Sequence, residues 1–280
     1  MYQINEPTTL LVYLVDHCHK KRNDAKNLLK YKQVNVNGDT ITRYDYELKP
    51  GDILTIGEKQ KNPLPFPILF ENEDIIVIDK PCGLVAEQTR SNKDRTAYAI
   101  VKDYLKKKGD DIYLVHRLDQ YTSGVMMFVK NKKLYYELTH NWNDYVVTRG
   151  YKAIVEGKLS SDKGTIDNYL EENKGQKVYV GSPKRGKRAI THYQVEKVKG
   201  HYSLLDVHLD TGRKNQIRVH MAHIHHPIIG DQKYGGTTNP IKRLGLHAYE
   251  FAFRHPFTKQ VMSFKSDMPF EMKRLMGIKR

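Results

Sequence analysis

The chain has 280 residues with 47 Lys or Arg and 32 Asp or Glu, so its formal net charge is +15. Hydrophobic residues make up 39%, which is enough to bury a core and argues against a disordered chain. Apolar runs such as those at 10–15 and 75–78 are far shorter than the roughly 20 residues that a membrane span needs. Two cysteines and the lack of a signal-peptide pattern predict a cytoplasmic protein without a disulfide framework.

The excess positive charge belongs to one part of the chain. Residues 1–60 hold 9 basic and 8 acidic side chains, whereas residues 61–280 hold 38 and 24, a net charge of +14. Three alternating prolines at 61–67 favour an extended linker. We therefore predict a small module at 1–60, a linker at 61–67 and a large domain at 68–280. The charge favours a polyanionic partner such as nucleic acid over a merely soluble basic surface.

Two short helices and then strands are predicted in the first 60 residues. Thr8 or Thr9 can cap the first helix and Asn23 the second. The segment V-N-V-N-G at 34–38 predicts a hairpin, and L-K-P-G-D-I-L at 48–54 predicts a turn followed by a strand. The region of the second helix is strongly basic, with Lys20, Lys21, Arg22, Lys26, Lys30 and Lys32.

This order of elements resembles the small RNA-binding module first known from a ribosomal protein, the S-four type. The resemblance covers about 50 residues and rests on the basic second helix and the two segments at 34–38 and 48–54. It implies that Lys26 and Lys30 contact RNA. The alternative is a solvated helix face beside a generic hairpin.

The large part mixes strands and helices without a βαβ rhythm. Strands are predicted at 75–78, 125–129, 151–155, 192–198 and 204–209, and helices at 96–108 and 213–224. This pattern predicts an α+β domain with a mixed, largely antiparallel sheet flanked by helices.

Three patterns suggest other chemistry and are weaker. Residues 181–188 nearly form a phosphate-binding loop, but Arg188 stands where Ser or Thr is required. Ser123 near His116 and Asp119 lacks a G-x-S-x-G elbow, which argues against a hydrolase triad. A histidine cluster lacks both H-E-x-x-H and a cysteine pair, so structural or RNA-facing roles are favoured over zinc; its members are His220, His223, His225 and His226.

Residues 174–188 hold six basic side chains and no acidic one, with Gly, Ser and Pro between them. This composition predicts a mobile basic loop that contacts phosphates, and a merely solvated loop fits equally well. The predicted contacts are Lys184, Arg185, Lys187 and Arg188.

The most informative segment is H-R-L-D-Q-Y-T-S-G at 116–124, directly before an apolar strand. Asp119 lies beside potential cations, which keep a carboxylate ionised and able to act as a nucleophile or a base. From the residues alone, an Asp that caps a turn is the better interpretation.

The segment resembles the signature of the RluA family of pseudouridine synthases, and further motifs of that family follow in order. They are K-P-C-G-L at 80–84, Y-K-A-I-V-E-G at 151–157, T-G-R-K-N-Q-I-R-V-H at 211–220, P-I-I-G-D at 227–231, Y-G at 234–235, L-H-A at 246–248 and F-R-H-P at 253–256. The match spans about residues 68–270. The sequence departs from the family pattern at three places. Asn215 stands where the family usually has His, and Gln120-Tyr121, after the catalytic position, and residues 85–88 differ from the family's usual residues.

The resemblance implies that uridine in a structured RNA is isomerised to pseudouridine, with no cofactor and no metal. Asp119 matches the catalytic carboxylate, and Arg218 matches the Arg that pairs with it. A two-pronged contact from Arg218 would keep this carboxylate ionised. Tyr151 matches the Tyr that stacks on the base. Arg117 matches the residue that fills the vacated place in the stack. Further expected RNA contacts are His116, Thr122, Ile217, Arg213 and Gln216.

The implied substrate is large-subunit ribosomal RNA, with transfer RNA as the alternative. A non-catalytic RNA-binding or ribosome-assembly factor on the same fold is a second hypothesis, and a metal-dependent hydrolase that uses the histidine cluster is a weaker third. A monomer without a membrane or an obligate protein partner is predicted.

Overall fold

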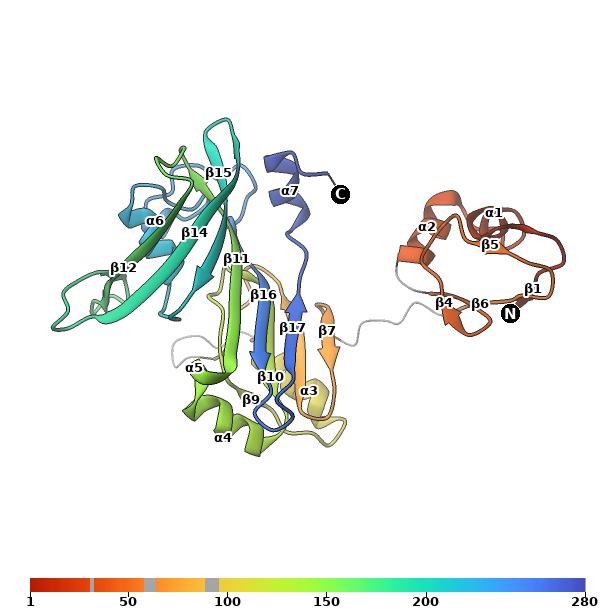
Figure 1. Ribbon diagram of the computed structural model, residues 1–280, viewed down its shortest axis with the longest axis horizontal. Helices are drawn as coiled ribbons and strands as arrows, with labels where there is room; N and C mark the ends of the chain where they lie inside the picture. The colour runs from red at the N-terminus through yellow and green to blue at the C-terminus, as the bar shows by residue number, and fades with distance from the viewer. Residues whose placement is uncertain (31–32, 58–63, 89–95, 280) are drawn as a thin grey trace. The chain divides into compact units, whose positions relative to one another are not determined.

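The computed structural model describes residues 1–30, 33–57, 64–88 and 96–279, and of Lys30 only the backbone. The chain divides into two compact units, Met1–Asn62 and Pro63–Arg280 (Figure 1). Lys32 and residues 61–63 of the predicted linker lie outside the described residues, as does the side chain of Lys30.

The small unit packs two helices against short strands around its own apolar core. Its helices are α1 (Leu10–Asp16) and α2 (Arg22–Lys30), and its strands are β1 (Tyr2–Gln3), β2 (Thr8–Thr9), β3 (Val34–Val36), β4 (Asp39–Thr40), β5 (Glu47–Leu48) and β6 (Ile53–Ile56). Thr9 occupies the N-cap position of α1 but makes no side-chain cap hydrogen bond. The second helix begins at Arg22, so Asn23 lies inside it and the predicted cap is wrong.

The Asn-Gly pair between β3 and β4 turns the chain as the sequence predicts. Asn37 and Gly38 have φ of 53° and 93°, the left-handed values that a tight hairpin turn requires. β3 then pairs with β6 as well as with β4, so the hairpin joins a four-stranded sheet.

The larger unit is built on one sheet of eleven strands, ordered β13-β12-β14-β15-β11-β16-β10-β8-β7, with β17 added to β16 and β9 to β10. Its strands are β7 (Ile68–Glu71), β8 (Ile75–Lys80), β9 (Tyr113–Leu114), β10 (Ser123–Val129), β11 (Val146–Glu156), β12 (Lys163–Glu172), β13 (Val178–Val180), β14 (Lys187–Lys199), β15 (Tyr202–Leu209), β16 (Leu246–Arg254) and β17 (Val261–Lys265). The strands β12, β14 and β15 run at an angle to those around β16 (Figure 1).

Among the described residues, β10 and β16 pair in parallel and every other strand pairing of this sheet is antiparallel. The predicted mixed, largely antiparallel α+β fold is therefore confirmed. The helices of the unit are α3 (Ala97–Lys106), α4 (Lys132–His140), α5 (Trp142–Tyr145), α6 (Gln216–His223) and α7 (Phe270–Met276), with a 3₁₀ turn at Gln232–Tyr234. None of the helices in the described ranges is long and apolar enough to cross a membrane.

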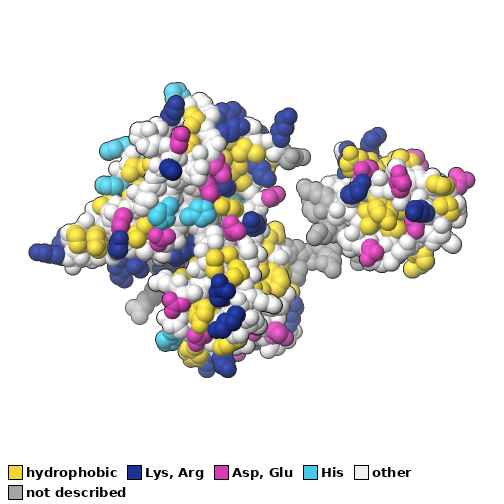
Figure 2. All heavy atoms as spheres, in the orientation of Figure 1, with side chains coloured by type: hydrophobic (Ala, Val, Ile, Leu, Met, Phe, Trp, Pro, Cys, Tyr) yellow, Lys and Arg dark blue, Asp and Glu magenta, His cyan; other side chains and the backbone are white. Residues whose placement is uncertain are grey.

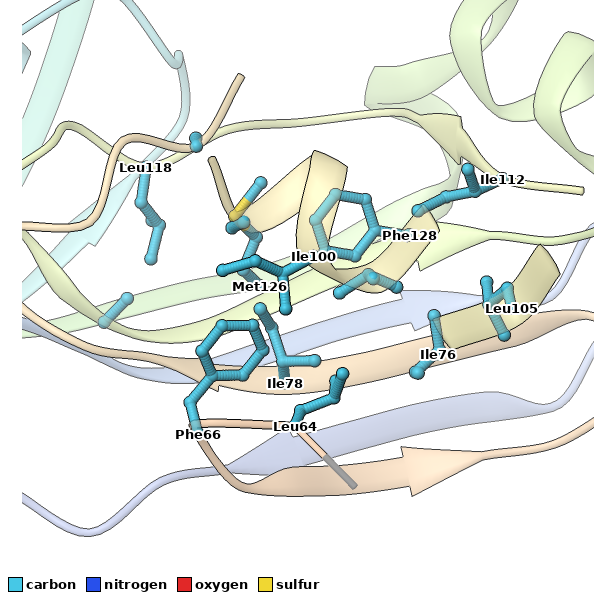
Figure 3. Close-up of a cluster of buried hydrophobic side chains, with 14 residues drawn as sticks. Leu64, Phe66, Ile76, Ile78, Ile100, Leu105, Ile112, Leu118, Met126 and Phe128 are labelled. Carbon is cyan, nitrogen blue, oxygen red and sulfur yellow. The ribbon is translucent and has the colours of Figure 1, made fainter. Parts of the chain in front are cut away.

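Helix α3 covers one face of the sheet and forms a core with β8 and β10 (Figure 3). The Thr96 side chain accepts a hydrogen bond from the Ala99 amide and so caps this helix. Leu118, the residue before Asp119, packs into the same core and is 6% exposed. This packing fixes the segment that leads to the predicted catalytic carboxylate.

Two differences from the sequence-based prediction concern segments near the predicted site. The helix predicted at 213–224 begins at Gln216, because Asn215 adopts a left-handed backbone with φ 55°. The segment 174–188 is not a single loop, since β13 lies within it and β14 begins at Lys187.

Candidate active site

Asp119 lies in a turn whose two ends are held by buried residues. The Thr122 amide donates to the Asp119 carbonyl over 3.1 Å, and Thr122 is 2% exposed. Strand β10 begins at Ser123 and enters the sheet beside β16. The turn is thus held between the Leu118 core contact and the first residues of a central strand.

A buried lysine also stabilises this turn through hydrogen bonds to backbone carbonyls. Lys80 at the end of β8 is fully buried, and its Nζ donates to the carbonyls of Pro81, Leu84 and Gln120 over 2.8–3.1 Å. Burial lowers the pKa of Lys80 to about 8, so at neutral pH it is still mainly an ammonium with three N–H donors for three carbonyls. The residue after Asp119 is therefore held by Lys80.

Most of the predicted site residues line one small pocket around Asp119, which we call the catalytic pocket. Its volume is 80 Å³. The predicted residues in its lining are Arg117, Asp119, Thr122, Tyr151, Arg213, Gln216, Ile217 and Arg218. They come from the turn before β10, from β11 and from the start of α6, which lie far apart in the sequence.

Arg218 makes its two-pronged contact with Asp231 and not with Asp119. Its Nε and Nη2 donate to the two Asp231 carboxylate oxygens over 2.7 and 2.8 Å, whereas its Nη1 lies 3.9 Å from Asp119 Oδ2. Arg218 also lies over the ring of Tyr234, 5.0 Å from the centroid. The expectation of a two-pronged Asp119–Arg218 contact is corrected: Arg218 is an oriented neighbouring charge.

Asn215 connects the pieces of this arrangement. Its backbone is left-handed, which Asn adopts more readily than most residues, and its backbone amide helps to lower the Asp119 pKa. Its side chain accepts from Arg218 Nη1 over 2.9 Å and donates to the Tyr234 hydroxyl over 2.9 Å. Asn215 therefore orients Arg218 and favours the ionised form of Asp119.

Desolvation dominates the electrostatics of the pocket. Burial raises the pKa of Asp119, and the charge of Arg218, the Asn215 amide and Lys80 offset only part of that rise. Arg218 lowers the Asp119 pKa, as expected of its partner, but the opposite effect of burial is larger. The Asp119 side chain remains 26% exposed, so a substrate can reach it. Burial also raises the pKa of Tyr151 to about 12, which keeps its phenol protonated at neutral pH.

Two residues expected to contact RNA are engaged inside the protein. His116 Nε2 accepts from the Met127 amide over 2.9 Å, its ring stacks on Phe251, and burial lowers its pKa to about 4. Gln216 donates to Ile190 O and Thr191 Oγ1 and is 2% exposed. Both side chains are thus held by contacts within the protein, and Gln216 also lines the catalytic pocket.

The basic segment, residues 174–188, carries both cations that are paired with carboxylates and cations that are not. Arg185 pairs with Glu171 over 3.2 Å, and Arg188 pairs with Asp167 through two hydrogen bonds of 2.9 and 2.6 Å. Neither Lys184 nor Lys187 forms an ion pair with another described residue, and both are exposed. Lys and Arg side chains are prominent at this end of the larger unit, near the tip of the β12 region (Figure 2).

The clustered histidines face different partners. His220 is fully buried and its Nδ1 lies 2.9 Å from Thr191 Oγ1, whereas His226 Nδ1 lies 2.8 Å from the Glu156 carbonyl. No group of three His, Cys, Asp or Glu side chains within the described ranges could hold a metal ion. Ser123 hydrogen-bonds His247 rather than His116.

Sequence reasoning gave no role to Asn215, Asp231, Lys80 or Arg149. Asp231 belongs to the P-I-I-G-D motif at 227–231, but sequence spacing does not show which residue its buried carboxylate pairs with. Arg149 could have been found, because it lies two residues before Tyr151 on one strand and therefore shares its face.

A mixed sheet with a central cleft that holds a buried carboxylate, a Tyr and an Arg defines an α+β enzyme. Its fold is similar to those of two human proteins, RNA pseudouridylate synthase domain containing 4 and 1. The TM-scores are 0.62 and 0.60, and both pairs are 21% identical in sequence. The first match covers 76% of this chain and 94% of the human chain, the second 74% and 85%.

The family model described as RNA pseudouridylate synthase matches residues 74–223, and the chain belongs to this family. An uncharacterized RNA pseudouridine synthase of Chlorobaculum parvum is 33% identical, with 90% of this chain and 87% of the relative covered. Ribosomal large subunit pseudouridine synthase D of Vibrio cholerae is 31% identical, with 90% and 84% covered. The protein is therefore an RNA pseudouridine synthase, an intramolecular isomerase that acts on RNA.

Proposed function

We propose that the protein converts specific uridines of large-subunit ribosomal RNA to pseudouridine, with Asp119 as the catalytic carboxylate. The observation that carries the proposal is the catalytic pocket, in which Asp119 is partly exposed between Tyr151 and Arg218. The carboxylate either attacks the nucleoside or abstracts a ribose proton, and both routes require its ionised form. Bond breakage, base rotation and rejoining occur on one molecule, so no co-reactant is consumed.

The neighbours of Asp119 take distinct roles in this proposal. Tyr151 stacks on the uracil ring from β11, and Ile217 packs the opposite side of the pocket from α6. Arg218 stabilises the carboxylate from 3.9 Å. A stacked base cannot reach such a pocket, so the uridine is extruded at a cost of a few kcal/mol. The exposed Arg117 at the pocket then fills the vacated place in the RNA.

Large-subunit ribosomal RNA is favoured because relatives that are 31 to 33% identical carry the name ribosomal large subunit pseudouridine synthase D. We propose that the small unit is an S-four-type RNA-binding module that helps to select this RNA. The support is its exposed Lys26 on α2, together with the β3–β4 hairpin that the resemblance predicts. Transfer RNA is the alternative substrate.

The proposal is tested by mapping pseudouridines in total RNA from cells with and without the gene. Loss of one or a few sites in large-subunit RNA supports it, and loss confined to transfer RNA selects the alternative. A non-catalytic assembly factor predicts no change in either RNA.

The variant Asp119→Asn tests the role of the carboxylate. It preserves the shape of the side chain and should abolish pseudouridine formation while RNA binding is largely retained. Normal activity of this variant would rule out Asp119 as the catalytic group. The exposed Asp267, which is 99% solvent-accessible, offers the matched control Asp267→Asn with wild-type activity.

A further inference from the structure

Two larger pockets share lining residues with the catalytic pocket. The middle pocket has a volume of 330 Å³ and shares Arg117 and Tyr151 with the catalytic pocket. The outer pocket has a volume of 450 Å³ and shares Arg149 with the middle one. Gly212 lines all three, so they form one continuous recess beside Asp119.

Arg149 stands where the middle and outer pockets meet. Its Nη2 donates to the Asp210 carbonyl, but its buried Nε has no hydrogen-bond partner among the described residues. No described carboxylate forms an ion pair with it. A buried N–H without a partner is unfavourable, and a partly buried guanidinium without a carboxylate is a prepared anion site.

Gly212 packs against the Arg149 guanidinium, and Arg213 brings a second cation to the same recess. A Cβ on Gly212 would lie 2.9 Å from Arg149 Nη1, so only glycine permits this approach without a shift. Arg213 follows directly and lines both the outer and the catalytic pockets. Its Nε is held by the Arg188 carbonyl over 3.0 Å, which fixes the stem of a second cation near the first.

We propose that Arg149, assisted by Arg213, binds the phosphodiester that flanks the extruded uridine. The proposal deepens the proposed function and rests on it. A uridine whose base enters the catalytic pocket remains joined to its ribose, so a flanking phosphate lies at the mouth of that pocket. The planar edge of a guanidinium matches two phosphate oxygens, and the Arg149 guanidinium lines both the middle and the outer pockets. The phosphate would fix the nucleotide so that its sugar faces Asp119.

The first experiment needs no catalysis. Uridine, uridine 5′-monophosphate and uridine 3′-monophosphate are titrated into the full chain and followed by NMR. The wild type should bind one monophosphate roughly ten- to a hundredfold more tightly than uridine, which is the range for a charge-assisted hydrogen bond. Arg149→Met should lose this preference and Arg149→Lys should keep part of it. No preference in the wild type, or an unchanged preference in Arg149→Met, would overturn the proposal.

A second experiment uses an RNA hairpin that the wild type modifies, made with a neutral methylphosphonate 5′ or 3′ to the target uridine. One of these two neutral linkages should slow modification by the wild type tenfold or more. The same linkage should not slow Arg149→Met below its rate on the unmodified RNA. Equal further slowing in both proteins would overturn the proposal. Arg254→Met is the control, because Arg254 on β16 lines none of the three pockets, and it should respond as the wild type does. If no RNA is modified at all, the proposed function fails, and the monophosphate titration still decides whether Arg149 binds phosphate.

Discussion

Arg218 is bound by Asp231 through two hydrogen bonds of 2.7 and 2.8 Å and approaches Asp119 only to 3.9 Å. Asp231 is 1% exposed and Arg218 is 7% exposed, so this is a buried ion pair. Two carboxylates therefore share one guanidinium, and the one that holds it tightly is not the proposed catalytic group. Asp231 is a positioning residue that aims the cation at Asp119.

Replacement of Asp231 by Asn should impair both folding and catalysis. Loss of one partner from a buried pair costs about 3–5 kcal/mol of the free energy of unfolding. With its position released, Arg218 should no longer orient Asp119, and we expect kcat to fall at least tenfold while the KM for RNA changes little. Thermal melting and steady-state kinetics below the melting transition measure the two effects. An unchanged kcat in a folded variant would show that Arg218 needs no such support.

The pH dependence of activity should report the environment of Asp119. The reaction needs the carboxylate, whose pKa burial raises above its usual value, so the acid limb of kcat/KM should lie above the ordinary Asp range. Arg218 lowers this pKa, so Arg218→Met should move the limb to still higher pH. Arg254→Met serves as the control and should leave it in place. A limb that does not move in Arg218→Met would mean that another group limits the rate.

Gly124 should be among the least replaceable residues of the sheet. Its φ is 118°, and a Cβ would lie 2.1 Å from the Ala248 carbonyl oxygen on the neighbouring β16. We expect Gly124→Ala to cost about 3 kcal/mol or more of the free energy of unfolding, since strain and overpacking add. Gly109→Ala is the control, because its φ is 81° but a Cβ there would meet no atom within 4 Å. It should cost about 1–2 kcal/mol. Denaturant unfolding of both variants compares them, and equal losses would refute the role of the Ala248 contact.

The comparison between β10 and β16 shows where sequence reasoning ends. Strand 125–129 was predicted from a continuous apolar run, and β10 confirms it with two further residues at its start. Its parallel partner begins more than 100 residues later, and a pairing at that separation leaves no local pattern in one sequence. The S-G step before the strand is visible in the sequence, but the carbonyl that makes the glycine necessary is not.

In the site too, local sequence predicted the contacts within one segment but not those that depend on packing between distant segments. Local order brought Arg117, Asp119 and Thr122 together correctly, because they share one turn. The tighter partner of Arg218 was missed, because packing and not sequence spacing decides which of two nearby carboxylates a guanidinium binds more closely, and Asp119 keeps the 3.9 Å ion pair. The contact of His116 with RNA stays a prediction: its ring is stacked on Phe251 and hydrogen-bonded to the backbone, and the residue also lines the middle pocket.

The salt dependence of RNA binding should separate the free from the paired cations of the basic segment. Each phosphate contact releases counterions, so affinity falls steeply with added salt. The double variant Lys184→Ala/Lys187→Ala should lower the slope of log K against log salt by roughly 1 to 2. Asp167→Asn should act in the opposite direction, because it releases Arg188 from its carboxylate and leaves a free guanidinium at the same edge. Fluorescence anisotropy with a labelled ribosomal RNA fragment measures the slopes. Identical slopes in all three proteins would show that this segment does not contact RNA and that the charge of the larger unit acts elsewhere.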